Sequence, residues 1–273
     1  MLREALEWFL TPAGPAARKL GYLGESIALE ARFRRNRAAW APHLEASRRA
    51  VADAVDASEG TALAVVLGSG PLLDVPLGHL LRRFDRVILV DILHPWRARG
   101  IARRTPKLFL MEADLSGIAD AVAANPRHMP AIHPPDALDG LKPDFTVSLN
   151  LLSQLAQAPW KALGAAGHPQ DALAALHADL ARTHLDWLSA LPGRRCMIAD
   201  QAQETEYPDR TEIWRPLDGL ALPAPDRNWD WQIAPAGERG DGAVQTNRVA
   251  AWLDLPGPAA TADGDLSTVQ DSP

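Results

Sequence analysis

The sequence predicts an α/β protein with a doubly wound, mostly parallel seven-stranded sheet that ends in an antiparallel hairpin. Three observations support this fold class. Five short apolar segments alternate with helical patterns, a glycine turn follows the first of them, and a short, glycine-rich connection joins two further segments near the end. We expect a helical extension at residues 1–60, the sheet domain at residues 61–255 and a disordered tail at residues 256–273.

The parallel strands are expected at apolar segments bounded by turn-forming or acidic residues. Their ranges are 63–67, 86–91, 108–111, 145–150 and 196–200, and the hairpin is formed by residues 229–233 and 248–253. Helical spacing of apolar residues supplies the crossovers, most clearly over residues 171–191, whereas residues 126–143 are rich in proline and are expected to be a loop.

The first sixty residues indicate helices. A short amphipathic segment ends at Pro12 and Pro15, and a longer helix is expected over residues 25–39 until Pro42 interrupts the pattern before a further helix. This region carries a basic cluster formed by Arg32, Arg34, Arg35 and Arg37. We interpret the cluster as a solvated helix face, and the alternative is a lid that holds an acidic substrate over a pocket.

The composition is that of an ordinary soluble globular protein, since 47% of its 273 residues are hydrophobic and 23% are charged. A formal net charge of -6 argues against a nucleic-acid partner, because neutralising phosphates requires a basic face. We expect a cytoplasmic protein with no membrane partner, because no apolar run is long enough to span a bilayer or to serve as a secretory signal. The single cysteine, Cys196, excludes an internal disulfide and a cysteine-rich metal site.

The turn Gly68-Ser69-Gly70 after the first strand is the centre of the expected ligand site. Glycine allows unusual backbone dihedrals and leaves room for a ligand, and in an open α/β sheet this turn lies where ligands bind. Asp91 ends the second strand about twenty residues later. A carboxylate at that position accepts hydrogen bonds from ribose hydroxyls, which suits either a dinucleotide or an adenosine sulfonium compound.

Leu73 and Asp74, which follow the turn, distinguish a dinucleotide from an adenosine sulfonium ligand. The dinucleotide fingerprint needs a third glycine, and Leu73 stands at that position. Asp74 is expected to be the N-cap of the next helix, where its carboxylate would compete with a pyrophosphate for the positive helix end. The sequence therefore favours a sulfonium ligand over NAD.

Together these motifs resemble class I S-adenosylmethionine-dependent methyltransferases over residues 60–254. The resemblance is carried by residues 66–70 as the glycine motif, Val90-Asp91 as the ribose-binding acid, residues 112–115 as the adenine motif and residues 145–154 as the fourth-strand motif. It implies that S-adenosylmethionine is the cofactor, with its methionine part at the glycine turn, its ribose at Asp91 and its adenine at Asp114. The cofactor-binding residues that it implies are Gly68, Ser69, Gly70, Asp91, Ile92, Asp114, Leu115, Asn150 and Leu151.

The sequence departs from the pattern of this family at two places. Val65 and Val66 stand where an acid usually contacts the methionine ammonium, and Leu151 follows Asn150 in place of the Pro-Pro-aromatic motif of amino-methylating enzymes. The second departure argues against a nucleobase or a glutamine amide as the substrate. No catalytic residue is singled out, although four residues at or after the end of the fifth strand are candidate bases: Asp200, Glu204, Glu206 and Tyr207.

The expected activity is methyl transfer to a small molecule. An alternative is a methyltransferase-like binding or scaffold protein that has lost catalysis. Aminocarboxypropyl transfer is a minor variant, because residues 68–72 also resemble the glycine turn of nicotianamine-synthase-type enzymes, and an NAD-dependent oxidoreductase is another.

Several residues have a plainer interpretation. Asp91 and Asp114 could be helix caps, Trp229 and Trp231 are interpreted as core aromatics, and no metal site is expected because His177 and His184 lack the spacing of zinc ligands on a helix. The methyltransferase interpretation fails if Asp91 and Asp114 lie at opposite sheet edges, or if side chains fill the space above Gly70.

Overall fold

The computed structural model describes residues 2–257, so nearly all of the tail predicted at residues 256–273 lies outside the described residues. Within that range, eight strands form one sheet with the order β3-β2-β1-β4-β5-β8-β7, and β6 pairs with β5 beside this path. The strands are β1 (Leu63–Leu67), β2 (Arg86–Asp91), β3 (Leu108–Glu112), β4 (Phe145–Leu149), β5 (Arg194–Glu206), β6 (Thr211–Trp214), β7 (Arg227–Ala234) and β8 (Val244–Trp252).

The first five strands are parallel, and β8, β7 and β6 are antiparallel to their neighbours. This arrangement confirms the predicted sheet and its terminal hairpin, with β6 as an additional strand. The chain moves outward from β1 to β2 and β3, then returns to the other side of β1 to form β4. The resulting switch point, where the strand order reverses between β1 and β4, is where open α/β sheets bind ligands.

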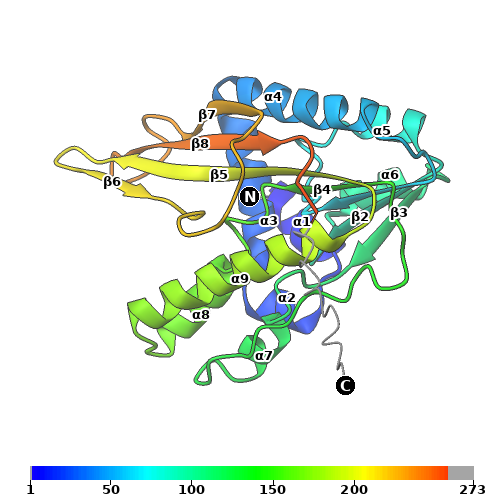
Figure 1. The fold of residues 1–273 in the computed structure, drawn as a ribbon. Coiled ribbons are helices and arrows are strands. Elements are labelled where there is room, and N and C mark those ends of the chain that lie inside the picture. Colours follow the sequence, from blue (N-terminus) through cyan, green and yellow to red (C-terminus); the bar gives the residue numbers. More distant parts are fainter. Residues whose placement is uncertain (1, 258–273) are drawn as a thin grey trace, which may run out of the picture.

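Helices cover both faces of the sheet, with α4 and α5 on one face and α8 and α9 on the other (Figure 1). Two apolar clusters separate these layers: one contains Val51 of α4 and Val66 of β1, and the other contains Leu188 of α9 and Val65 of β1. Both faces of β1 are therefore buried, as its uninterrupted apolar sequence predicts. The helices are α1 (Leu2–Leu10), α2 (Pro15–Lys19), α3 (Tyr22–Arg35), α4 (Arg37–Asp56), α5 (Leu77–Arg83), α6 (Trp96–Ala102), α7 (Ala119–Ala124), α8 (Gln157–Ala165) and α9 (Gln170–Ala190).

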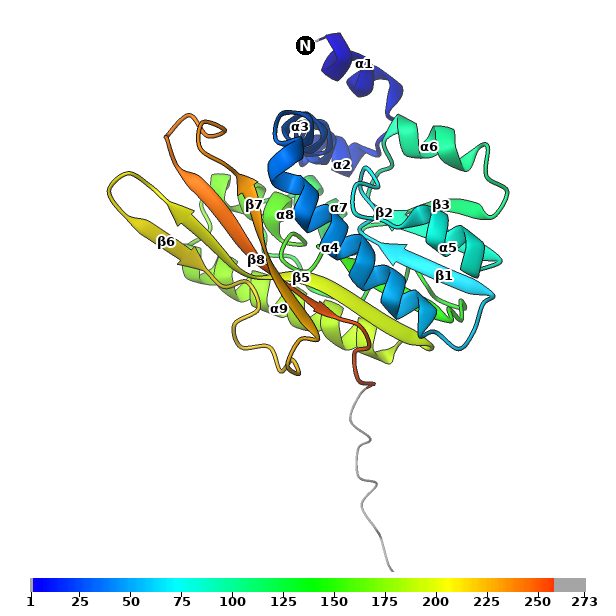
Figure 2. The same ribbon diagram turned by 90° about the horizontal axis from the view of Figure 1, so that it is seen from above.

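The predicted break at Pro42 is wrong, because the chain breaks at Asn36 and Pro42 lies inside α4. The backbone N–H and the side-chain amide of Asn36 both donate to the carbonyl of Arg32, which ends α3 there. Pro42 removes one backbone hydrogen bond from α4, but Trp40 and Leu44, which flank Pro42 in the sequence, are both buried. Packing against the sheet therefore outweighs the lost bond (Figure 2).

The strand predicted for β5 is too short, and α2, α8 and β6 are not predicted from the sequence. The strand predicted at residues 196–200 continues to Glu206 because its polar second half pairs with β8 and β6. None of the helices within residues 2–257 combines the length and apolar character that a bilayer span requires.

Candidate functional site

A cleft of about 670 Å³ opens at the carboxyl edge of the sheet, at the switch point between β1 and β4. Its volume lies within the range of about 300–1,000 Å³ that is usual for small-molecule sites. The carboxyl ends of β1 to β4 form its floor, while α3 and α4 contribute Tyr22, Leu29 and His43 to its wall. All nine residues that the sequence predicts at a cofactor line this one cleft: Gly68, Ser69, Gly70, Asp91, Ile92, Asp114, Leu115, Asn150 and Leu151.

The structure meets neither of the two conditions that would contradict the methyltransferase interpretation. Asp91 and Asp114 follow adjacent strands at the same sheet edge and border the same cleft. A Cβ atom added to Gly70 would meet no heavy atom within 4 Å, so the space above the turn is open.

The glycine turn is held by both neighbouring strands. Gly68 has a φ of +74°, and its backbone N–H donates to the carbonyl of Val90 at 2.9 Å. A Cβ atom at Gly68 would lie 3.0 Å from the carbonyl oxygen of Leu149 and 3.1 Å from the Cβ of Leu151. Position 68 therefore requires glycine both for its conformation and for its close contact with the end of β4.

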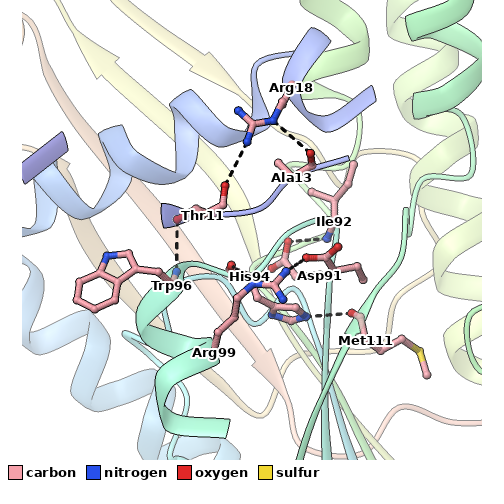
Figure 3. A network of polar contacts seen from close by, with 10 residues as sticks. Thr11, Ala13, Arg18, Asp91, Ile92, His94, Trp96, Arg99 and Met111 are labelled. Carbon is pink, nitrogen blue, oxygen red and sulfur yellow. Dashed lines mark hydrogen bonds and ion pairs between the residues drawn. The ribbon is translucent and has the colours of Figure 1, made fainter. Parts of the chain in front are cut away.

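Asp91 connects the end of β2 to this turn through Gly70, and Figure 3 shows its neighbouring contact with Ile92. Its Oδ2 accepts the backbone N–H of Gly70 at 2.7 Å, and its Oδ1 accepts the N–H of Ile92 at 2.8 Å. Burial raises the pKa of Asp91, while these hydrogen bonds and the nearby His94 oppose the shift. Because an ionised carboxylate can accept about four hydrogen bonds, Asp91 retains acceptor capacity for a donor from the cleft.

The segment beneath Asp91 is fixed by its own polar contacts. His94 is buried, and its Nε2 donates to the carbonyl of Met111 at 3.0 Å, while Arg99 donates to the carbonyl of His94 at 3.2 Å. The backbone N–H of Trp96 donates to the Thr11 hydroxyl at 3.3 Å, which joins the start of α6 to the segment between α1 and α2 (Figure 3). These contacts hold one wall of the cleft in place.

Asp114 does act as a helix cap, as the plainer interpretation predicts. Its Oδ1 accepts the backbone N–H and the hydroxyl of Ser116, and its Oδ2 accepts the N–H of Ala119, the first residue of α7, at 2.7 Å. Tyr22 of α3 lines the cleft nearby. Burial and the charges of Asp114 and Asp91 raise the pKa of its phenol, so Tyr22 is a neutral hydrogen-bonding group.

The predicted N-cap role of Asp74 is wrong. The helix α5 begins only at Leu77, and its N-cap, Pro76, provides no side-chain hydrogen bond. Asp74 instead lines the cleft and accepts the side-chain N–H of Asn150 at 2.7 Å. Burial raises the pKa of Asp74, whereas Asn150 and the charge of Arg48 oppose the shift. A carboxylate thus borders the same cleft as the glycine turn, although β1 has Val65 and Val66 where the resemblance implies an acid.

Of the four candidate bases, Asp200 borders the cleft, and Glu204, Glu206 and Tyr207 do not. Trp231 is a core aromatic, as predicted, but it also lines the cleft and stacks on His43 with ring centroids 4.0 Å apart. Trp229 donates its indole N–H to Nδ1 of His43 at 3.0 Å. The sequence gives no signal for these contacts, because α4 and β7 are far apart along the chain.

The arginine cluster is a solvated helix face only in part, because Arg35 and Arg37 are exposed whereas Arg32 and Arg34 are half-buried. Arg34 pairs with Glu4 at 2.5 Å, and Arg35 pairs with Glu238 of the β7–β8 loop at 2.5 Å. Arg32 is the member of the cluster that borders the cleft. These ion pairs join α3 to α1 and to the loop between the last two strands.

The histidines of α9 are structural, as predicted. Nε2 of His177 donates to the carbonyl of Pro216 at 3.1 Å, and Nε2 of His184 lies 3.0 Å from the Ser148 hydroxyl. Within residues 2–257 no cluster of three or more His, Cys, Asp or Glu side chains is arranged to hold a metal ion.

Neither a scan of protein-family models nor a search of curated proteins finds a match to this sequence. Solved structures that it resembles include 1,6-didemethyltoxoflavin-N1-methyltransferase of Burkholderia thailandensis with bound S-adenosylhomocysteine, at 16% identity and a TM-score of 0.35 over 77% of this chain and 79% of that chain. The DhpI–SAH complex matches at 15% identity and a TM-score of 0.37, over 90% and 98% of the two chains. An O-methyltransferase family protein of Burkholderia thailandensis matches at 11% identity and a TM-score of 0.39, over 86% and 60%. What the cleft of this chain binds is therefore inferred from its own residues.

Proposed function

We propose that this protein is an S-adenosylmethionine-dependent methyltransferase that acts on a small molecule. The observation that carries the proposal is the convergence of the glycine turn, Asp91 and Asp114 on one open cleft at the switch point of the sheet. Elements that are distant in sequence thereby present hydrogen-bonding groups at successive strand ends, as an extended adenosine ligand requires.

The charge of the cleft supports a cationic ligand. Its lining contains five carboxylates and three basic side chains: Glu25, Asp74, Asp91, Asp114 and Asp200, against Arg32, Lys161 and Arg239. S-adenosylmethionine carries a sulfonium and an ammonium, which the acids favour, whereas the pyrophosphate of NAD is an anion. Pyrophosphates bind at a helix N-terminus directly after the glycine turn, but here α5 starts only at Leu77. The acidic lining of the cleft and the late start of α5 therefore disfavour an NAD-dependent oxidoreductase.

Each part of the proposed cofactor has a matching group. Asp91 accepts the ribose hydroxyls, Asp114 and the backbone N–H of Leu115 contact the adenine, and Ile92 lies beside them. The glycine turn faces the methionine part, whose ammonium is held by Asp74. Asn150 and Leu151 close the site beneath the sulfonium.

When bound, the cofactor supplies a methyl group attached to a positively charged sulfur, which is a good leaving group. The residues of the chain then need to align the acceptor with that methyl group and to exclude water. Asp74 also weighs against the alternative of an inactive scaffold protein, because it provides an acid in the cleft that β1 lacks. Asp200, a buried carboxylate in the same cleft, provides a candidate base.

Isothermal titration with S-adenosylhomocysteine and with NAD tests this proposal. We expect S-adenosylhomocysteine to bind and NAD not to bind, and we expect Asp91→Asn to weaken binding at least tenfold, about 1.4 kcal/mol. Binding of NAD in place of S-adenosylhomocysteine, or an unchanged affinity in the Asp91→Asn variant, would refute it.

A further inference from the structure

The end of the cleft away from the glycine turn is shaped by a bulge in β5. Asp200 pairs with Val249 of β8 and Ala202 pairs with Arg248, so Gln201 is an extra residue in the ladder. Side chains alternate between the two faces of a regular strand, so residues 200 and 203 would otherwise point to opposite sides. The bulge puts both on one face, and Gln203 donates to Oδ2 of Asp200 at 3.0 Å.

The two carboxylate oxygens of Asp200 differ in their hydrogen bonds. Its Oδ2 accepts hydrogen bonds from Gln203, from the hydroxyl of Ser153 at 3.1 Å and from the side-chain N–H of Asn247 at 3.0 Å. Its Oδ1 is buried and has no hydrogen-bond partner. Asp200 as a whole is only 1% exposed, and it borders the cleft. Within residues 2–257 no basic side chain forms an ion pair with Asp200. Burying a carboxylate oxygen without a hydrogen bond costs free energy, and a hydrogen-bond donor on a bound ligand would remove that cost.

The wall beside Asp200 is aromatic and contains another unused polar group. Trp231 pairs with Asn247 across β7 and β8, so its side chain lies on the same face as the Asp200 cluster. Its indole N–H is buried and has no acceptor, and the ring packs between His43 and Trp40. Ile233 and Leu29 add apolar surface to the cleft. This end of the cleft therefore offers an unused acceptor, an unused donor and apolar walls.

We propose that this end of the cleft is the acceptor subsite, and that it takes a small uncharged heteroaromatic compound whose ring N–H or O–H faces Oδ1 of Asp200. This inference rests on the proposed function. Aromatic walls favour a ring, and the Trp231 N–H donates to an acceptor atom on that ring. An acidic proton is required because a carboxylate deprotonates a phenol-like group, with a pKa of about 10, far more readily than an aliphatic alcohol.

The proposed step balances without a further reactant. The lone pair of the ring nitrogen or oxygen forms a bond to the methyl carbon, and the carbon–sulfur bond breaks with its electron pair going to sulfur. The positive sulfonium becomes a neutral thioether, the proton of the acceptor moves to Oδ1 of Asp200, and the carboxylic acid later releases that proton to water.

The test uses methyl-labelled S-adenosylmethionine with 2-hydroxypyridine and 4-hydroxyquinoline, and with cyclohexanol and cyclohexylamine as aliphatic counterparts. We expect at least one heteroaromatic compound, and neither aliphatic compound, to be methylated. Asp200→Asn should lower kcat at least 100-fold and leave the affinity for S-adenosylhomocysteine unchanged. Asp230→Asn is the matched control, because Asp230 is exposed and precedes Trp231 on β7. It should behave as wild type.

A second variant protects the test against misfolding of Asp200→Asn. Trp231→Phe keeps the ring but removes the indole N–H, so it should raise KM for the ring compound about tenfold without changing the affinity for S-adenosylhomocysteine. The acceptor proposal is overturned if wild type binds S-adenosylhomocysteine but methylates neither heteroaromatic compound, or if both variants retain wild-type kinetics. It is also overturned if Asp200→Asn abolishes S-adenosylhomocysteine binding. Failure of wild type to bind S-adenosylhomocysteine would instead refute the proposed function.

Discussion

Replacement of Gly68 by alanine should destabilise the protein more than the same replacement at two other glycines with positive φ. An L-residue in the left-handed region costs about 1–2 kcal/mol, and this cost applies at Gly68 (φ +74°), Gly70 (φ +46°) and Gly237 (φ +85°). Only at Gly68 would the new methyl group crowd its surroundings, because its Cβ would lie 3.0 Å from a backbone oxygen of β4. Crowding of a packed site adds about 1–3 kcal/mol.

The free energy of unfolding should therefore fall by about 2–5 kcal/mol in Gly68→Ala. In Gly70→Ala and Gly237→Ala it should fall by about 1–2 kcal/mol. Urea unfolding followed by circular dichroism measures all three, and the change in unfolded-chain entropy is common to them. Gly70→Ala should in addition weaken S-adenosylhomocysteine binding, because its methyl group projects into the cleft, whereas Gly237 lies outside it. If Gly68→Ala loses no more stability than Gly237→Ala, the close packing of the turn against β4 is wrong.

Three further predictions concern charged and reactive groups. Asp74→Asn should weaken S-adenosylmethionine binding at least tenfold in calorimetry while leaving the binding of adenosine unchanged; equal losses for both ligands would show that Asp74 does not contact the methionine part. Arg35 holds the pKa of Glu238 below its usual value of 4.5, so the ion pair contributes stability above that pH and loses it as the pH falls through the lower pKa of the folded state. Glu238→Gln should therefore lower the Tm at pH 7 but not at pH 2, with Glu59→Gln as an exposed control. A Tm loss that is the same at both pH values would contradict the ion pair. Burial raises the pKa of the Cys196 thiol, so it should react with a thiol reagent at the rate of global unfolding and not in the native state.

The parallel core was predictable because its strands are buried on both faces and therefore appear as uninterrupted apolar runs. The strand at residues 63–67 was predicted with the bounds that the structure has, and the hairpin was located to within a few residues at each end. The second half of β5 was not predictable, because its polar residues resemble a loop and become a strand only through pairing with β6 and β8.

The candidate site was predictable where chemistry follows strand ends. The glycine turn and Asp91 come directly after apolar runs, Asp114 comes three residues after another, and parallel strands bring those ends to one edge. Asp74 was placed wrongly because an aspartate before Val-Pro is a typical N-cap, and local preference gives no sign that the helix starts three residues later. The contacts of His43 and Trp231 depend on packing between distant elements, which no local pattern reports.

The central claim is that an adenosine sulfonium ligand lies across the carboxyl edge of the sheet. A crystal structure of the protein with S-adenosylhomocysteine tests it most directly. We expect the two ribose hydroxyls within hydrogen-bonding distance of the Asp91 carboxylate, the adenine beside Asp114 and Leu115, and the sulfur facing the Asp200 end of the cleft. A ligand bound elsewhere, or bound with its ribose away from Asp91, would contradict the account.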